Sequence, residues 1–355
     1  MSYPTSEKVS TEKDGLETLV YLLQQVLQGL PEIAVSLSGS SVSLCPLSYF
    51  CSMISDRLRV EPYLFNIYLD LLTAIANTSK KSAEAVYHFI DKAPSEHVSW
   101  SLMLHSLNEG DRLLQTDVAQ RGLLDADVTG FIAILGLLTA VLRHGAPCPA
   151  IRSNVQVNTV ALCIRLLHQP VHVILKARLC SLLTCLVSDP AFARVVLQQL
   201  EYGNMLPADG SSGLRYELET VESSMQAYPL TSSFLELLLA LVRVLSPRVV
   251  LASNAFPTLL QYVLHTIFLQ NDRRGFLSTR LGEKSLLSIH CLQFLSPFLT
   301  LFHELANGVI PNEDRMLLQR LIWLVGDLLS DHAVFQQVRI VNSIDYEYYD
   351  VENGM

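Results

Sequence analysis

The sequence predicts an all-α protein, built as an α-solenoid of HEAT/armadillo-like helical repeats. Almost every ordered stretch spaces its apolar residues at a helical period, and none alternates convincingly as a half-buried strand does. Similar apolar segments recur at 71–76 (LLTAIA), 137–142 (LLTAVL), 182–187 (LLTCLV) and, more loosely, 237–242 (LLLALV). The first three start 66 and 45 residues apart. The spacing is irregular, and the second interval falls within the roughly 40–47 residues of HEAT and armadillo helical pairs. Each segment ends a long apolar helix before a short polar break, which favours a stack of such pairs.

The composition indicates extensive burial between helices. Half of the 355 residues are hydrophobic and only 17% are charged, below the roughly 25% of an average soluble domain. The formal net charge of −9 argues against direct nucleic-acid binding, which requires clustered Lys and Arg. The seven cysteines form no C-x-x-C pair and no ligand-like spacing, so we expect buried, reduced thiols in a reducing compartment.

Three apolar stretches require a test as membrane spans. Residues 128–142 are the most apolar but fall short of the roughly 20 residues that a span needs. Residues 249–271 and 285–303 are longer, but both contain several polar side chains and a proline. Such groups are costly in lipid and ordinary between packed helices. We therefore expect a soluble chain without a transmembrane segment.

Helix start signals occur throughout the chain. In SDPAFARVVLQQL, Asp189 is expected to cap a helix whose first residue is Pro190, where a missing N–H costs nothing. Farther along, Asn312 and two acids are expected to open a helix in PNEDRMLLQRLIWLVGDLL. One apolar face of that helix is expected to contain Leu317, Leu318, Leu321, Leu324, Val325 and Leu328.

The helix in YPLTSSFLELLLALVRVL, residues 228–245, has two candidate starts. Thr231 could cap it, or Ser233 with Glu236 could form a capping box. On a helical wheel, Ser232, Ser233, Glu236, Ala240 and Arg243 lie within roughly 60° of one line, and the remaining positions from Phe234 to Leu245 are apolar. So narrow a polar stripe predicts a helix packed between neighbours on both sides, as stacked repeats require.

We find no pattern that predicts catalysis, a metal or a cofactor. HELAN begins like the zinc motif H-E-x-x-H, but Asn307 stands where the second histidine must be. In GFLSTRLGEKS, Glu283 separates Gly282 from Lys284 and would repel a phosphate. His168 and His172 have helical spacing, but Pro170 lies between them. We therefore expect no catalytic, metal-binding or cofactor-binding residues.

Three stretches resemble a known family. RYELETVESSMQAYPLTSSFLELL (residues 215–238), HVSWSLMLHSL (97–107) and the helical pair at 62–90 are similar to segments of the very large helical scaffold nucleoporins of the nuclear pore's inner ring. The resemblance covers roughly residues 60–270. The residues that carry it in the first two stretches are Val98, Ser99, Trp100, Glu217, Leu218, Val221, Glu222, Tyr228, Pro229, Leu230 and Thr231.

The resemblance implies a structural, non-enzymatic scaffold at the nuclear envelope that supports nucleocytoplasmic transport. It implies docking to other inner-ring scaffold nucleoporins and to linker nucleoporin segments, through apolar clefts between repeats. Because family members are several times longer, we expect a fragment, a truncated product or a partial gene model. No inserted small barrel is evident, which favours the branch of the family that lacks one.

Alternative functions remain open at this stage. Another helical-repeat adaptor, such as a transport receptor or an armadillo-type signalling scaffold, has the same architecture, and an all-α enzyme could assemble its site from distant residues. We expect a disordered N-terminus at 1–14, a single helical-repeat array at 15–340 and an acidic, Tyr-rich disordered tail at 341–355. Connectors within the array are expected near 36–46, 144–150, 203–213 and 271–284.

Overall fold

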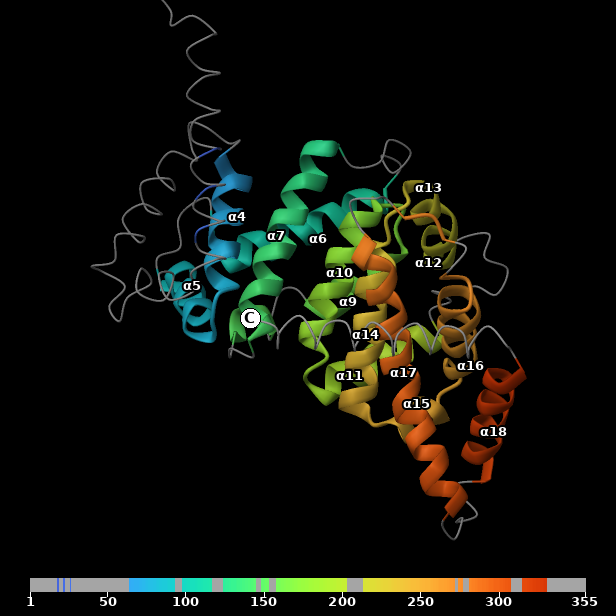
Figure 1. The fold of residues 1–355 in the computed structure, drawn as a ribbon. Coiled ribbons are helices and arrows are strands. Elements are labelled where there is room, and N and C mark those ends of the chain that lie inside the picture. Colours follow the sequence, from blue (N-terminus) through green and yellow to red (C-terminus); the bar gives the residue numbers. More distant parts are fainter. Residues whose placement is uncertain are drawn as a thin grey trace, which may run out of the picture. The chain divides into compact units, whose positions relative to one another are not determined.

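The computed structural model describes residues 64–92, 98–116, 124–144, 148–152, 158–202, 213–271, 274–276, 281–307 and 315–330, together with Thr18, Leu22 and Val26. Within these ranges every regular element is a helix and no strand is found, so the all-α prediction is confirmed (Figure 1). The segments 1–14 and 341–355 lie outside the described residues. The described helices group into two compact units, 1–185 and 186–355. The single array proposed for 15–340 stays a prediction.

The first unit contains α4 to α9 and nearly all of α10. The bounds are α4 Leu64–Ala76, α5 Lys80–Lys92, α6 Trp100–Leu114, α7 Asp125–Arg143, α8 Pro149–Arg152, α9 Thr159–His168 and α10 Val173–Leu186. Helix α4 packs against α5 and α7, and α6 packs against α8 and α9. The repeated apolar segments end α4 and α7, where both helices bury consecutive residues on several faces.

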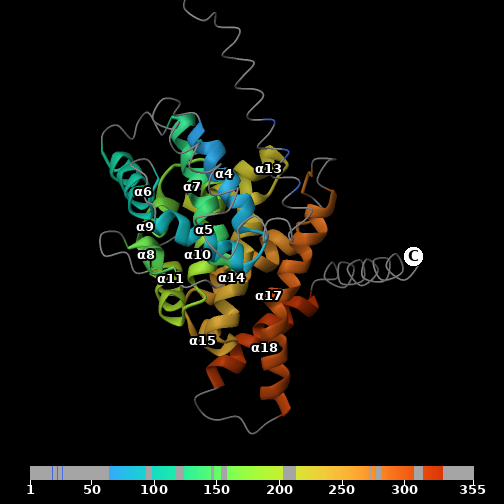
Figure 2. The ribbon, with the colours of Figure 1, turned by 90° about the vertical axis from the view of Figure 1, so that its left-hand side faces the viewer.

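The second unit is organised around α14. Its elements are α11 Pro190–Tyr202, α12 Gly213–Tyr216, the π-helix η2 Glu217–Val221, α13 Glu222–Met225, α14 Pro229–Leu245, α15 Pro247–Ala252, α16 Phe256–Gln261, the π-helix η3 Tyr262–Phe268, α17 Leu281–Asn307 and α18 Arg315–Ser330. Helix α14 contacts α11, α15 and α17, and α17 lies beside it in both ribbon views (Figures 1 and 2).

The predicted environment of α14 is confirmed. Glu236 and Arg243 are exposed, Ser232, Ser233 and Ala240 are partly exposed, and all but one of the apolar residues from Phe234 to Leu245 are buried. The polar stripe therefore faces solvent while the remaining faces pack on the helices around it. Burial on several sides accounts for the apolar character of this run.

Other start and connector predictions are confirmed in part. Helix α11 begins at Pro190, and the Asp189 carboxylate accepts a hydrogen bond from the Ala191 N–H at 2.8 Å. Helix α17 begins at Leu281, so the connector predicted at 271–284 is too long. The predicted opening of α18 at Asn312 lies outside the described residues.

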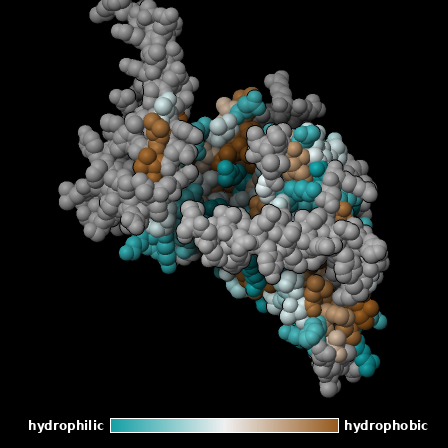
Figure 3. All heavy atoms as spheres, viewed as in Figure 1, coloured by the Kyte–Doolittle hydropathy of each residue, from teal (hydrophilic) through white to brown (hydrophobic). Residues whose placement is uncertain are grey.

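Helix α18 has one inward and one outward face within its described side chains. Leu321 is buried, and Leu317 and Leu318 are half-buried, as the apolar face predicts. The side chains of Leu324, Val325 and Leu328 lie outside the described residues. Met316 and Ile322 are exposed. Figure 3 shows apolar surface at the lower right, where α18 lies in the same view of Figure 1.

Among the described residues, two helices are long and apolar enough to cross a membrane by length and composition alone. They are Asp125–Arg143 in α7 and Gly282–Ala306 in α17, with 56% and 39% of the tested windows buried inside the fold. Packed core helices meet the same criteria, so this test does not by itself distinguish the two environments.

Candidate functional site

The stretch with the strongest family resemblance forms a junction between helices of the second unit. Residues 217–231, which we call the YPLT junction, run from η2 through α13 into the first turn of α14. Leu218 is fully buried, and Glu217 opens the π-helix η2. Helix α13 ends at Met225, and its C-cap residue Gln226 adopts a left-handed backbone conformation with φ of 52°. This conformation is uncommon for any residue with a side chain, and it reverses the chain between α13 and α14.

Glu222 caps α14 from outside the helix. Its fully buried carboxylate accepts hydrogen bonds from the Leu230 N–H at 2.5 Å, the Thr231 N–H at 3.0 Å and the Thr231 hydroxyl at 2.6 Å. The first N–H groups of a helix have no intrahelical acceptor, and Glu222 supplies one. Burial raises the pKa of this carboxyl to about 7, against the opposing influence of the Thr231 and Leu230 hydrogen bonds and the Arg274 charge.

Both predicted starts of this helix are wrong. The helix begins at Pro229, before Thr231 and Ser233, and its N-cap residue Tyr228 makes no side-chain capping bond. Proline suits the first helical position because its absent N–H would have lacked an acceptor. The capping side chain, Glu222, belongs to the preceding helix and does not occupy the N-cap position. The capping patterns at Thr231 and Ser233 therefore predicted the wrong start.

Tyr228 ties the junction to residues far along the chain. Its N–H donates to the Glu283 carboxylate at 3.1 Å, and its hydroxyl donates to the Gly275 carbonyl at 3.1 Å. The ring lies 4.9 Å from the Phe276 ring centroid, and the Arg274 guanidinium lies 4.9 Å from the Tyr228 ring centroid. Glu283, the residue that spoils the phosphate-binding motif, therefore anchors the start of α14 to α17.

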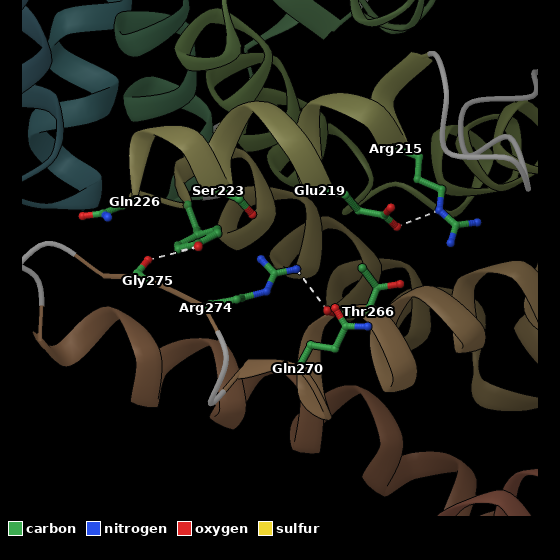
Figure 4. A pocket seen from close by; sticks show the side chains of 9 residues that line it. Arg215, Glu219, Ser223, Gln226, Thr266, Gln270, Arg274 and Gly275 are labelled. Carbon is green, nitrogen blue, oxygen red and sulfur yellow. Dashed lines mark hydrogen bonds and ion pairs between the residues drawn. The ribbon is translucent and has the colours of Figure 1, made fainter.

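A polar cleft of about 440 Å³ opens beside this junction (Figure 4). Its walls come from α12, η2 and α13 on one side, and from η3, Gln270, Arg274 and Gly275 on the other. Arg215 forms an ion pair with Glu219 at 2.7 Å, and Arg274 donates to the Thr266 carbonyl at 3.1 Å. The lining residues are Arg215, Glu219, Ser223, Gln226, Tyr228, Thr266, Gln270, Arg274 and Gly275.

The resemblance residues of the first unit start a helix and fill the core. Val98 is buried, and the Ser99 hydroxyl accepts from the Leu102 N–H at 3.1 Å, which makes Ser99 the N-cap of α6. Trp100 donates through its indole N–H to the Tyr87 carbonyl at 3.2 Å and stacks on the Tyr87 ring at 5.5 Å. These side chains join α5 to α6.

The incomplete motifs remain separate in the structure. His168 ends α9 and His172 precedes α10, where its ring accepts from the Ile174 N–H at 3.2 Å. His303 is exposed on α17. Across the described ranges, no group of three or more His, Cys, Asp or Glu side chains could hold a metal ion. Cys45 and Cys51 lie outside those ranges. Burial raises the pKa of the Cys148 and Cys163 thiols to about 11 and about 12, which disfavours the reactive thiolate.

The fold and its motif residues define a class: an α-helical repeat scaffold whose most distinctive side chains hold helices together. Residues 57–307 match the family model described as nuclear pore complex scaffold, nucleoporins 186/192/205. The chain therefore belongs to this family of nuclear pore scaffold nucleoporins, whose members are components of the nuclear pore complex at the nuclear envelope. The predicted membership and location are confirmed.

One curated relative illustrates the relationship. The chain is 26% identical over 269 residues to the human nuclear pore complex protein Nup205, an alignment that covers 67% of this chain. The same alignment covers 13% of the human protein. The chain thus spans a small part of the length of the relative that it matches.

The structure adds functional candidates that the sequence motifs did not identify. Arg274 and Gly275 meet the YPLT junction from positions about 50 residues farther along the chain. No local pattern marks them, since their roles depend on η3 returning the chain to this place. By contrast, the family resemblance in the sequence had already marked Glu222, Tyr228, Leu230 and Thr231.

Proposed function

We propose that this chain is a docking scaffold of the nuclear pore's inner ring, without catalytic activity. Membership of the nuclear pore scaffold family supports the proposal most directly. The family is structural, and the motif residues of this chain follow the same logic. Their polar groups form hydrogen bonds with helix ends or with a backbone carbonyl, as at Ser99, Glu222 and Tyr228.

The proposed partners are other inner-ring scaffold nucleoporins and short segments of linker nucleoporins. A stack of helices presents long surfaces on which partner segments can lie, and each contact buries a small area. The exposed apolar side chains Met316 and Ile322 on α18 and the polar cleft beside the YPLT junction are chemically different surfaces. They would suit different partner segments.

The test is affinity capture of the tagged full chain from a nuclear-envelope extract, with bound proteins quantified by mass spectrometry. An unrelated tagged helical-repeat protein of similar length serves as the control for nonspecific binding. We expect inner-ring nucleoporins to be enriched over that control. Enrichment of transport cargo or signalling proteins without nucleoporins would replace this proposal with the alternative, a transport receptor or armadillo-type adaptor.

A further inference from the structure

Three unusual backbone features of the second unit contribute residues to the polar cleft beside the YPLT junction. Glu219 comes from the π-helix η2, Thr266 comes from the π-helix η3, and Gln226 has the left-handed conformation between α13 and α14. Single-turn π-helices and strained residues concentrate at functional sites, where the surrounding structure maintains them. Three such features in one cleft indicate a surface shaped for a ligand.

The lining of the cleft specifies a polar ligand. None of the nine lining residues has an aliphatic side chain, and Tyr228 contributes the single aromatic ring. An amphipathic helix docks through apolar anchors, which this lining lacks. The amide side chains of Gln226 and Gln270 and the hydroxyl of Ser223 can donate to and accept from peptide groups. These groups match the backbone of an extended segment.

The charges of the cleft specify an anionic group with a single charge. The lining contains two arginines, Arg215 and Arg274, and one carboxylate, Glu219, so it has one positive charge in excess within a chain of net charge −9. Glu219 would repel a doubly charged phosphate, whereas a carboxylate requires one arginine. Figure 4 shows Arg274 between the two walls, with Arg215 and Glu219 paired beside it.

The Arg274 guanidinium is incompletely hydrogen-bonded by the chain. Nη2 donates to the Thr266 carbonyl, while Nη1 is covered and has no hydrogen-bond partner. The guanidinium also lies over the Tyr228 ring. For a carboxylate in the cleft to bind Nη1, the guanidinium must turn from the Tyr228 ring and bring this covered nitrogen into the cleft. The exchange replaces a cation–π contact with a stronger charge-assisted hydrogen bond.

We propose that the cleft lined by Arg215, Gln226, Gln270 and Arg274 binds an extended acidic segment of a partner protein, with one Asp or Glu carboxylate on Arg274. The inference rests on the proposed docking function and names the chemistry of one docking site. The cleft volume of about 440 Å³ falls within the roughly 300–1,000 Å³ of known ligand pockets, enough for a few residues of such a segment.

The test uses the full chain and a displayed library of random peptides, with binding of selected peptides measured by fluorescence polarisation. Gln270 is exposed at the rim of the cleft, so its charge can be changed without disturbing the core. We expect selected peptides to contain an Asp or Glu. Gln270→Glu should weaken their binding roughly tenfold, and Gln270→Lys should strengthen it by a similar factor.

Matched variants at Gln293, exposed on α17 outside the lining, control for a general effect of charge. Gln293→Glu and Gln293→Lys should change binding less than twofold, and thermal unfolding should be the same for all four variants. Selected peptides without acidic residues, or equal affinities for the two Gln270 variants, would overturn the proposal. Binding of inorganic phosphate in place of peptides would also overturn it.

The same variants separate this proposal from the proposed function. If the wild-type chain captures inner-ring nucleoporins and the Gln270→Glu chain captures the same set equally, the scaffold function stands and the cleft assignment fails. If the wild-type chain captures no nucleoporin while acidic peptides still respond to Gln270 as expected, the cleft assignment stands and the proposed function fails.

Discussion

Replacing Glu222 by glutamine should change how the stability of the second unit depends on pH. Burial raises the pKa of the Glu222 carboxyl from 4.5 to about 7 in the folded chain. The folded state therefore holds a proton more tightly than the unfolded chain between these values. The tighter binding of this proton adds to the free energy of unfolding. This contribution is complete below about pH 4.5, falls as the pH rises toward 7, and is absent above about pH 7.

The magnitude follows from the size of the shift. Each pKa unit corresponds to about 1.4 kcal/mol, so a shift from 4.5 to about 7 amounts to about 3 kcal/mol. Glutamine has nearly the same shape but does not titrate. The glutamine amide has only one oxygen acceptor, and its N–H₂ group would face the N–H and hydroxyl donors that now bind the carboxylate. A buried donor that loses its acceptor lowers the free energy of unfolding by about 1–3 kcal/mol.

The assay is urea unfolding followed by circular dichroism at about pH 5 and about pH 8, with the two units fitted as separate transitions. The difference between the free energies of unfolding of the wild type and the variant removes the contribution of every other titrating group. We expect the wild type to lose about 3 kcal/mol relative to Glu222→Gln between the two pH values. Glu236→Gln, an exposed change on α14, should show no such difference. Parallel pH profiles for wild type and Glu222→Gln would refute the reasoning.

Two further predictions concern helix ends and close packing. Ser99→Ala removes the N-cap of α6 and should lower the free energy of unfolding by about 1 kcal/mol, while Ser101→Ala at an exposed neighbour should leave it unchanged; denaturant titration checks both. Gly110→Ala would place a Cβ 2.5 Å from the Phe131 ring and should cost about 1 kcal/mol. The exposed Gly326 has nothing within 4 Å of an added Cβ, so Gly326→Ala should instead stabilise α18 by about 0.5–1 kcal/mol. Shifts of the same sign for the two glycines would contradict this account.

Local patterns were sufficient where the structure depends on neighbours in sequence. The helical period predicted an all-α chain, and Asp189 before Pro190 predicted the start of α11 correctly. The narrow stripe through Glu236 and Arg243 predicted a helix packed on several sides. Each of these predictions depends on spacing within one or a few turns, which the backbone geometry of a helix translates directly into faces and ends.

Local patterns failed where distant residues meet. The start of α14 was predicted at the wrong residue because its cap is Glu222 on α13. The sequence predicted apolar docking clefts and did not predict the polar cleft lined by Arg215 and Arg274. Gln226 has a left-handed backbone although nothing in its sequence context demands glycine-like freedom. That conformation is maintained by the helices on either side of it.

The sequence by itself determined the helical fold class, the packed character of α14 and, through motifs such as Tyr228-Pro229-Leu230-Thr231, the family to which the chain belongs. The tertiary structure decided that Glu222 caps α14, that Glu283 and Gly275 hold Tyr228, and that Arg274 lies across a cleft from the ion pair of Arg215 and Glu219. The physical reason is the range of the interactions. Helical periodicity is encoded within a few residues, whereas a buried carboxylate or an arginine finds its partner only after the chain has folded back on itself.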